Sequence, residues 1–190
     1  MANEESLRIA GERVTTQRRG SVMNPYTGAL VATVAQASRD DVHRAIRVAK
    51  AFRSPLTRYQ RNQICQRTAE ILRARTREIS DLITAESGLC KKDSIYEVGR
   101  ACDVFQFAGN AALQDDGQIF SCDLTAHGKR RKVYTLREPL LGVISAITPF
   151  NHPLNPVAHK VAPSIASNNR MVLKPSEKTP LSALLLADIL

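Results

Sequence analysis

The C-terminal quarter of the chain contains the pattern that most restricts the fold. Two short apolar runs, at 143–147 and 171–173, flank a stretch at 155–166 whose apolar residues recur at helical spacing. A further helix is expected after the second run, with Thr179 as its cap and Pro180 at its first helical position. Strand, helix, strand and helix with short connections predict a βαβ unit, whose two parallel strands should be covered on both faces.

The sequence before residue 115 predicts a mostly helical region that follows a few short strands. Residues 7–34 combine β-prone stretches with turn signals. Ser38 and Thr57 each open a capping-box pattern, in which a residue three positions later can bond back to the start of a helix. Two more helices are expected, one ending at Gly88 and one spanning about 93–113.

Residues 118–124 and 132–137 predict two strands joined by a basic turn at His127 and Gly128. Their mixed polarity is typical of a protruding hairpin rather than of a core element. The predicted fold class is therefore α/β, with a helical front, a protruding β-hairpin and the start of an incomplete, Rossmann-like parallel sheet. The three parts are expected at 1–117, 118–138 and 139–190.

Composition excludes several classes of protein. The chain has 190 residues and a formal net charge of +9, from 27 Lys and Arg against 18 Asp and Glu. The charges are spread along amphipathic helices and aromatic residues make up only 5% of the chain, so we expect solvated helix faces and no nucleic-acid partner. No apolar run approaches the roughly 20 residues of a membrane span, and no membrane partner is expected.

The cysteines and the N-terminus indicate the compartment. Glu4 and Glu5 stand where a secretory signal would have an apolar block. The cysteines have no metal-ligand spacing, so no metal site is expected. We therefore expect reduced thiols and a cytoplasmic location. The four cysteines are Cys65, Cys90, Cys102 and Cys122.

The expected last helix, at 181–190, is apolar on nearly every side. A helix of this kind belongs inside a larger body, and a parallel strand pair needs further elements to cover it. We therefore expect the chain to be the truncated front part of a longer protein.

Two proline-containing loops follow the predicted parallel strands, at the place where ligands bind in open α/β sheets. The first is Thr148-Pro149-Phe150-Asn151-His152-Pro153, and the second is Lys174-Pro175-Ser176-Glu177, followed by Thr179-Pro180. With the early Asn24-Pro25 turn and the order of helices, hairpin and βαβ unit, they resemble the aldehyde dehydrogenase superfamily. The resemblance covers about residues 7–190 and implies NAD(P)-dependent oxidation of an aldehyde to an acid.

The resemblance implies a role for residues of both loops. Asn151 would donate a hydrogen bond to the oxygen on which charge develops, and such a donor typically lowers a barrier by about 3 kcal/mol. Lys174 and Glu177 would bind the adenosine ribose hydroxyls. Glu177 favours NAD, with NADP possible, because a carboxylate repels a ribose phosphate. The residues expected to line the cofactor cleft are Ile147, Thr148, Pro149 and Phe150.

The resemblance also places the family's nucleophilic cysteine and general-base glutamate beyond residue 190. None of the four cysteines has the Gly-Gln-x-Cys type of surroundings of that nucleophile. Cys102 shares an apolar helix stripe with Val98 and Phe105 and is expected in the core. We therefore expect the purified chain to produce no NADH from an aldehyde by itself.

Within the superfamily, the sequence most resembles the phosphonoacetaldehyde dehydrogenases, in segments at 56–59, 94–100, 115–124 and 149–155. This resemblance implies oxidation of phosphonoacetaldehyde to phosphonoacetate in phosphonate degradation. Arg100, His152 and His159 would face the substrate tunnel, where a cationic Arg and two imidazoles suit an anion. The residues alone also allow two other placements, with Arg100 facing solvent and His159 packed on the sheet.

Two alternatives remain for function. One is oxidation of another small anionic aldehyde, such as a semialdehyde or sulfoacetaldehyde. The other is a non-catalytic remnant or partner that docks through its hairpin. The hairpin at 118–138 resembles the oligomerisation arm of the family, so a full-length enzyme is expected to be a homo-oligomer.

Overall fold

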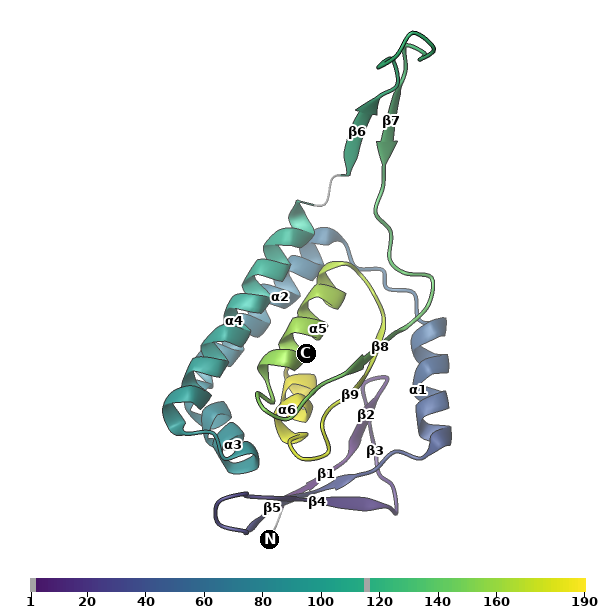
Figure 1. Cartoon of the computed structure of the whole chain (residues 1–190). Coiled ribbons are helices and arrows are strands. Elements are labelled where there is room, and N and C mark those ends of the chain that lie inside the picture. The colour runs from purple at the N-terminus through teal and green to yellow at the C-terminus, as the bar shows by residue number, and fades with distance from the viewer. Residues whose placement is uncertain (1–2, 115–116) are drawn as a thin grey trace.

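The computed structural model describes residues 3–114 and 117–190 and has a mixed α/β fold (Figure 1). Asp115 and Asp116, part of one segment compared with the phosphonoacetaldehyde dehydrogenases, lie outside the described residues. The helices are α1 (Arg39–Ala51), α2 (Arg58–Ala74), α3 (Thr76–Ser87), α4 (Lys91–Leu113), α5 (Asn155–Ala166) and α6 (Leu181–Ile189). The strands are β1 (Asn3–Glu5), β2 (Leu7–Ile9), β3 (Glu12–Val14), β4 (Arg19–Met23), β5 (Leu30–Ala35), β6 (Gln118–Ser121), β7 (Lys132–Thr135), β8 (Ile144–Ile147) and β9 (Met171–Lys174).

The N-terminal strands form two small sheets at one end of the molecule. β5 pairs in parallel with β1 and antiparallel with β4, and β2 pairs with β3. Asn24 Oδ1 accepts hydrogen bonds from the backbone N–H groups of Tyr26 at 2.9 Å and Thr27 at 3.0 Å, which confirms the predicted turn. Arg8 of β2 donates to Asp188 of α6 at 2.6 Å and so joins the first strands to the last helix.

The helix boundaries follow the local signals in the sequence. Ser38 Oγ accepts a hydrogen bond from the N–H of Asp41, and Thr57 Oγ1 accepts one from the N–H of Gln60, each at 3.2 Å, so both predicted capping boxes are present. α3 ends at Gly88, whose φ of 75° lies in the left-handed region that favours glycine. The helical front is thus confirmed.

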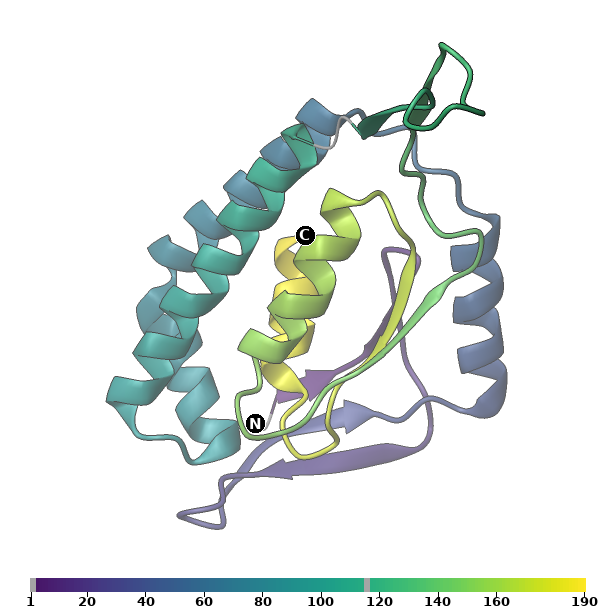
Figure 2. The same ribbon diagram turned by 45° about the horizontal axis from the view of Figure 1, so that its top comes forward.

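The main hydrophobic core lies among α2, α3, α4, α5 and α6. α5 lies between α4 and the β8–β9 pair (Figure 2). Gly109 lets α4 approach α2 closely, because a Cβ at this position would lie 3.0 Å from the Cβ of Cys65. Cys102 is buried in this core, as predicted. The largest buried side chains of the core are Leu72, Ile79, Ile83, Phe105, Leu154 and Leu186.

The apolar stripe of α1 remains largely exposed. Val42 and Ile46 are each 42% exposed, Phe52 is 55% exposed, and no residue of the helix is buried. The periodicity of these residues therefore predicts the helix correctly, although the elements within residues 3–114 and 117–190 leave its stripe largely exposed.

The predicted βαβ unit is present and its strands are parallel. β8 and β9 pair from Ile144 opposite Met171 to Ile147 opposite Lys174. The expectation that both faces of the pair are covered is wrong, because Ile147 is 66% exposed and only Ala146 in β8 is buried. An apolar run indicates that a strand tends to be buried, but the described elements cover the β8–β9 pair only in part.

The start of α6 differs from the prediction. The helix begins at Leu181, Pro180 occupies its N-cap position, and Thr179 is not its cap. Instead, the buried carboxylate of Glu86, on α3, accepts hydrogen bonds from the N–H groups of Leu181 and Ser182. A side chain 95 positions away in sequence replaces the local cap, so the local sequence could not reveal it.

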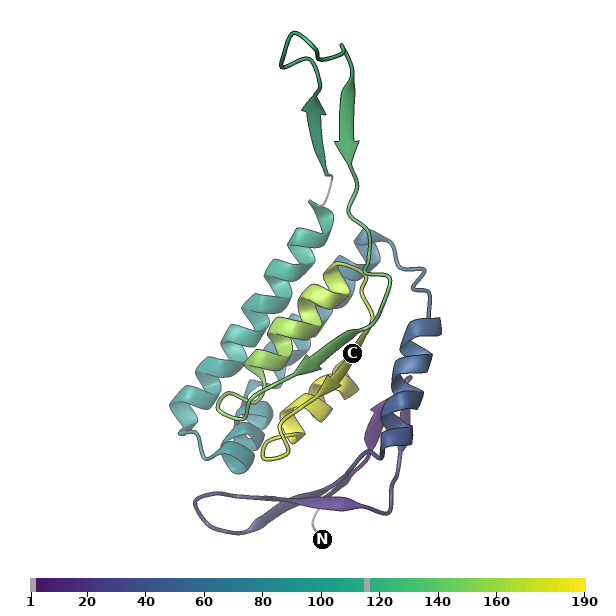
Figure 3. The ribbon, with the colours of Figure 1, turned by 45° about the vertical axis from the view of Figure 1, so that its right-hand side comes forward.

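The β6–β7 hairpin extends away from the other elements (Figure 3). Every residue of its two strands is exposed, which agrees with the predicted protruding arm. The division of the chain at residues 117 and 138 stays a prediction. Among the described residues, no helix has the length and apolar character that crossing a membrane requires.

The two glycines of α4 provide a test of the α2–α4 packing. A Cβ added at Gly99 would meet nothing within 4 Å, so Gly99→Ala should raise the free energy of unfolding by about 0.5–1 kcal/mol through helix propensity. Gly109→Leu should lower it by about 1–3 kcal/mol, because its side chain must enter the contact with Cys65. Urea denaturation measures both values, and a stable Gly109→Leu variant would contradict the close approach.

Candidate functional site

The two loops predicted to carry chemistry leave the sheet at the same edge. Ile147 and Lys174 are register partners at the carboxyl ends of β8 and β9, so the loops after them start side by side. The N–H of Thr148 donates to the backbone oxygen of Lys174 at 3.3 Å and extends the pairing by one residue. The structure therefore brings the Asn151 turn and the Lys174 turn to one end of the strand pair.

The two loops also contact each other. The Nζ of Lys178 lies 4.5 Å from the centroid of the Phe150 ring, a cation–π contact between the second loop and the first. Thr179 Oγ1 lies 3.5 Å from the backbone oxygen of Phe150, at the limit of a hydrogen bond. These contacts hold the backbone on one side of Asn151. The Asn151 side chain is exposed and makes no hydrogen bond within the described part of the chain, so its amide is available to a ligand.

Lys174 and Glu177 form an exposed donor–acceptor pair. Their Nζ and Oε2 atoms lie 3.0 Å apart, and Nζ also donates to the backbone oxygen of Pro175 at 3.2 Å. Hydrogen bonding from its own backbone, and then from Lys174, lowers the pKa of Glu177, so this carboxyl is ionised at neutral pH. The ammonium can donate to one hydroxyl of a diol while the carboxylate accepts from the other. These two residues therefore fit a ribose.

A buried glutamate fixes the end of the Asn151 turn. Glu97, on α4, has a side chain only 1% exposed, and its Oε1 accepts hydrogen bonds from the N–H groups of Leu154 and Asn155, each at 2.8 Å. Its Oε2 lies 3.5 Å from Nδ1 of His152. α5 therefore starts at a point set by a neighbouring helix.

A second buried glutamate plays the same part for the other loop. Glu86 Oε2 accepts from the N–H of Leu181 at 2.7 Å, and Oε1 accepts from the N–H of Ser182 at 2.9 Å and from its hydroxyl. Burial raises the pKa of Glu86 to about 7, although these hydrogen bonds favour the ionised form. Each loop thus runs from the end of a strand to a helix whose first N–H groups bind a carboxylate of the helical front.

The predicted substrate residues are only partly brought together. Nδ1 of His152 lies 3.5 Å from Oε2 of Glu97, on α4. His159 is exposed, one turn after the start of α5. Arg100 lies on the exposed face of α4, where its guanidinium is 5.9 Å from the Tyr96 ring centroid and 3.5 Å from the Tyr96 hydroxyl. Its side chain thus stacks on its own helix.

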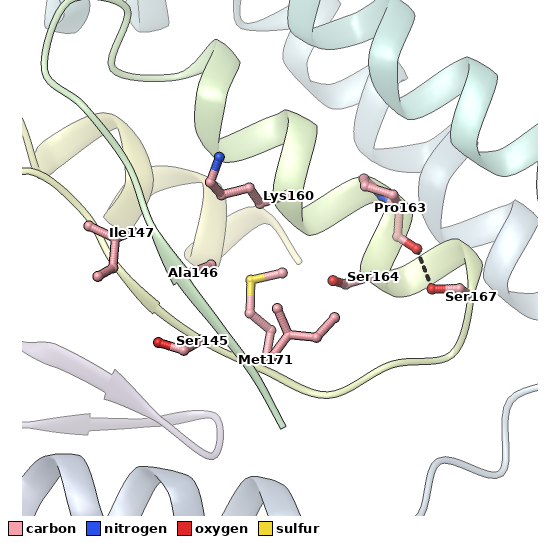
Figure 4. A pocket seen from close by; sticks show the side chains of 9 residues that line it. Ser145, Ala146, Ile147, Lys160, Pro163, Ser164, Ser167 and Met171 are labelled. Carbon is pink, nitrogen blue, oxygen red and sulfur yellow. Dashed lines mark hydrogen bonds between the residues drawn. The ribbon is translucent and has the colours of Figure 1, made fainter. Parts of the chain in front are cut away.

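The predicted cofactor-lining residues divide between two places. Thr148 is buried beneath the loops, whereas Pro149 and Phe150 are exposed at the mouth. Ile147 lies instead beside an open hollow formed by β8, β9 and α5 (Figure 4). The hollow is lined by Ile144, Ser145, Ala146, Ile147, Lys160, Pro163, Ser164, Ser167 and Met171. Of the predicted site residues, Ile147 lines the hollow, whereas Asn151 and Lys174 do not.

Comparison with known proteins identifies the family. The sequence profile of the aldehyde dehydrogenase family matches residues 13–190. The chain belongs to the aldehyde dehydrogenase family. This result confirms the resemblance drawn from the two loops.

Three relatives illustrate the extent of the similarity. The 3-sulfolactaldehyde dehydrogenase of Priestia aryabhattai is 35% identical over 185 residues, which are 97% of this chain and 39% of that protein. Aldehyde dehydrogenase 21 of Physcomitrella patens, solved with its reaction product succinate, superposes with a TM-score of 0.92 and 34% identity over 100% of this chain and 40% of that one. The NADP-dependent glyceraldehyde-3-phosphate dehydrogenase of Bacillus halodurans, complexed with NADP, superposes with a TM-score of 0.87 and 30% identity over the same shares. The chain therefore spans about two fifths of the length of these relatives.

The sequence analysis missed three residues of the candidate site. Glu86 and Glu97 interrupt apolar helix stripes, beside Ile83 and Val98, and a carboxylate at such a position indicates a buried partner. Lys178 carried no such signal, because its contact with Phe150 depends on how two loops fold against each other.

Glu86 makes the stability of the chain depend on pH. Its pKa of about 7 lies above the ordinary value of 4.5, so the folded chain binds a proton that the unfolded chain lacks between these pH values. The contribution of Glu86 to stability is therefore fully present below pH 4.5 and is lost as pH rises through 7, a change of up to about 3 kcal/mol. Glu86→Gln keeps one acceptor oxygen and does not titrate. Urea unfolding of the two proteins should give a free-energy difference that changes across this window, and parallel curves would contradict the assignment.

Proposed function

We propose that this chain forms the N-terminal part of an NAD(P)-dependent aldehyde dehydrogenase that oxidises a small anionic aldehyde to its acid. The observation that carries the proposal is the exit of the Asn151 turn and the Lys174–Glu177 turn from one edge of a parallel strand pair. Membership of the family, and similarity to enzymes whose names state NAD or NADP, support it.

The first loop would stabilise charge during the reaction. The Asn151 amide is exposed and uncommitted, so it can donate to the aldehyde oxygen as that oxygen becomes negative. Lys174 and Glu177 would hold the ribose of the cofactor, which favours NAD and permits NADP, and Thr148, Pro149 and Phe150 would line its entrance. The cofactor, when bound, supplies the acceptor for the hydride.

The nucleophile and the general base would lie outside residues 1–190. Burial raises the pKa of Cys65 to about 11 and also raises that of Cys102, so neither thiol is ionised at neutral pH. Cys122 lies beyond the end of β6, on the arm that extends away from the other elements. The free cysteines suit a cytoplasmic enzyme.

The substrate would carry a negative group. Arg100 lies on α4, His152 in the turn before α5 and His159 on α5, and all three residues are exposed. Arg100 would have to leave Tyr96 to reach a ligand at the Asn151 turn. Phosphonoacetaldehyde is the substrate that we propose first, because its phosphonate uses a guanidinium and ring N–H donors together. A sulfonated aldehyde is the second candidate, which the similarity to a 3-sulfolactaldehyde dehydrogenase favours.

The hairpin would join copies of the full-length enzyme. Ile119 is 72% exposed and Tyr134 is 71% exposed, although both are apolar residues on paired strands. A second copy that covers these side chains would account for exposed apolar residues on an arm that projects from the fold.

Substrate kinetics of the full-length enzyme test the proposal. The kcat/KM should be higher for phosphonoacetaldehyde, sulfolactaldehyde and semialdehydes than for betaine aldehyde, whose charge is positive, because the site offers cations. NADH formation at 340 nm measures each rate. A preference for betaine aldehyde would sink the proposal of an anionic substrate.

The role of Arg100 has its own test. Arg100→Ala should raise the KM for phosphonoacetaldehyde about tenfold or more, which corresponds to about 1.4 kcal/mol, because one charge-assisted pair is lost. Lys92→Ala removes an exposed cation from the first turn of the same helix and serves as the matched control. If both variants keep the KM of the wild type, Arg100 does not bind the substrate.

A further inference from the structure

Glu97 acts on α5 from outside that helix. The first N–H groups of a helix have no partner within it, and Leu154, at the N-cap position of α5, has no side-chain oxygen to supply one. Glu97 Oε1 fills this gap for both Leu154 and Asn155. Because the helix dipole is positive at this end, a carboxylate is the favoured partner.

The second carboxylate oxygen of Glu97 is not accounted for by this cap. Oε2 is buried and accepts no hydrogen bond within the described residues. Leaving a carboxylate oxygen buried without a donor is costly. Nδ1 of His152 lies 3.5 Å from Oε2, slightly beyond a good hydrogen bond. The amide oxygen of Asn155 is also buried and unpaired, so this end of α5 has spare acceptors and needs a donor.

Because His152 belongs to the Asn151 turn, its contact with Glu97 affects the geometry of the candidate site. His152 follows Asn151 directly, and its ring is 48% exposed. The turn is fixed at one end where Thr148 pairs with β9 and at the other where Glu97 binds Leu154. A hydrogen bond from Nδ1–H to Glu97 would fix the ring between these points and leave Nε2 directed away from the carboxylate.

We propose that Glu97 is a positioning residue for the Asn151 turn, with one oxygen setting the start of α5 and the other orienting His152 through Nδ1–H. The role in catalysis rests on the function proposed above for Asn151 and His152. Glu97 thereby determines that Nε2 is the ring nitrogen that faces the substrate. Nε2 donates to an anionic group in the imidazolium form, in which both ring nitrogens carry a proton. The local geometry and the test of it do not depend on that function.

Glu86 provides a matched control within the same fold. It is a buried glutamate that binds the first N–H groups of α6 as Glu97 binds those of α5. Its partners are Leu181 and Ser182, and both of its oxygens are used. Glu86→Gln therefore makes the same chemical change at the same kind of helix start without touching His152.

The imidazole ¹⁵N spectrum of the 190-residue chain tests the orientation. At about pH 8.5 a neutral imidazole carries one N–H proton. The hydrogen bond that the ring makes decides whether Nδ1 or Nε2 holds this proton. His152 should show the Nδ1–H form in the wild type, unlike the exposed His43, His127 and His159, and should lose it in Glu97→Gln but keep it in Glu86→Gln. Because Oε1 of the glutamine can still accept from Leu154 and Asn155, the amides of these residues should stay protected from exchange. A wild-type His152 in the Nε2–H form, which needs no variant to observe, would overturn the inference.

Kinetics of the full-length enzyme separate this inference from the proposed function. Glu97→Gln should raise the KM for the anionic aldehyde more than threefold and leave the KM for NAD unchanged, whereas a general loss of structure would change both. If the His152 spectrum changes as expected but His152→Asn leaves the aldehyde KM unchanged, the positioning role stands and the substrate role of His152 fails. If Glu97→Gln leaves the spectrum of His152 unchanged, the positioning role fails whatever the enzyme oxidises.

Discussion

The parallel pairing of β8 with β9 determines where this chain can hold a ligand. Because Ile147 lies opposite Lys174, the loops after the two strands start at one edge. An antiparallel pair would send them to opposite ends, and Asn151 and Lys174 could not serve one site. The crossover through α5 makes the parallel arrangement possible, since a short turn could not return the chain to the same edge.

Two buried carboxylates connect the helical front to this strand pair. A buried charge is costly by itself, but here each meets free N–H groups at the positive end of a helix dipole. Glu86 and Glu97 lie on α3 and α4, and their partners begin α6 and α5. The front therefore does more than cover the strands, because it sets where both loop-closing helices start.

The elements with local signals could be predicted from the sequence. The capping boxes at Ser38 and Thr57, the left-handed Gly88 and the apolar runs of β8 and β9 all depend on neighbours in sequence. The candidate site was predicted from the family's two loop patterns, and the structure adds that they converge. The roles of Asn151 and of the other site residues stay predictions.

The features that sequence analysis missed depend on partners far along the chain. The exposure of Ile147 depends on which elements cover a strand, and the cap of α6 comes from Glu86 rather than from Thr179. The stacking of Arg100 on Tyr96 could be anticipated only as a helix-neighbour contact, since the two residues are four positions apart.

The ion pair of Arg8 with Asp188 links the second strand to the last helix across 180 residues. During synthesis the β2–β3 hairpin leaves the ribosome well before α6, and it cannot dock in this way until α6 has been made. The α2–α4 pair, by contrast, closes over a much shorter span and can form earlier. The β2–β3 hairpin therefore lacks this contact until almost all of these residues have been translated.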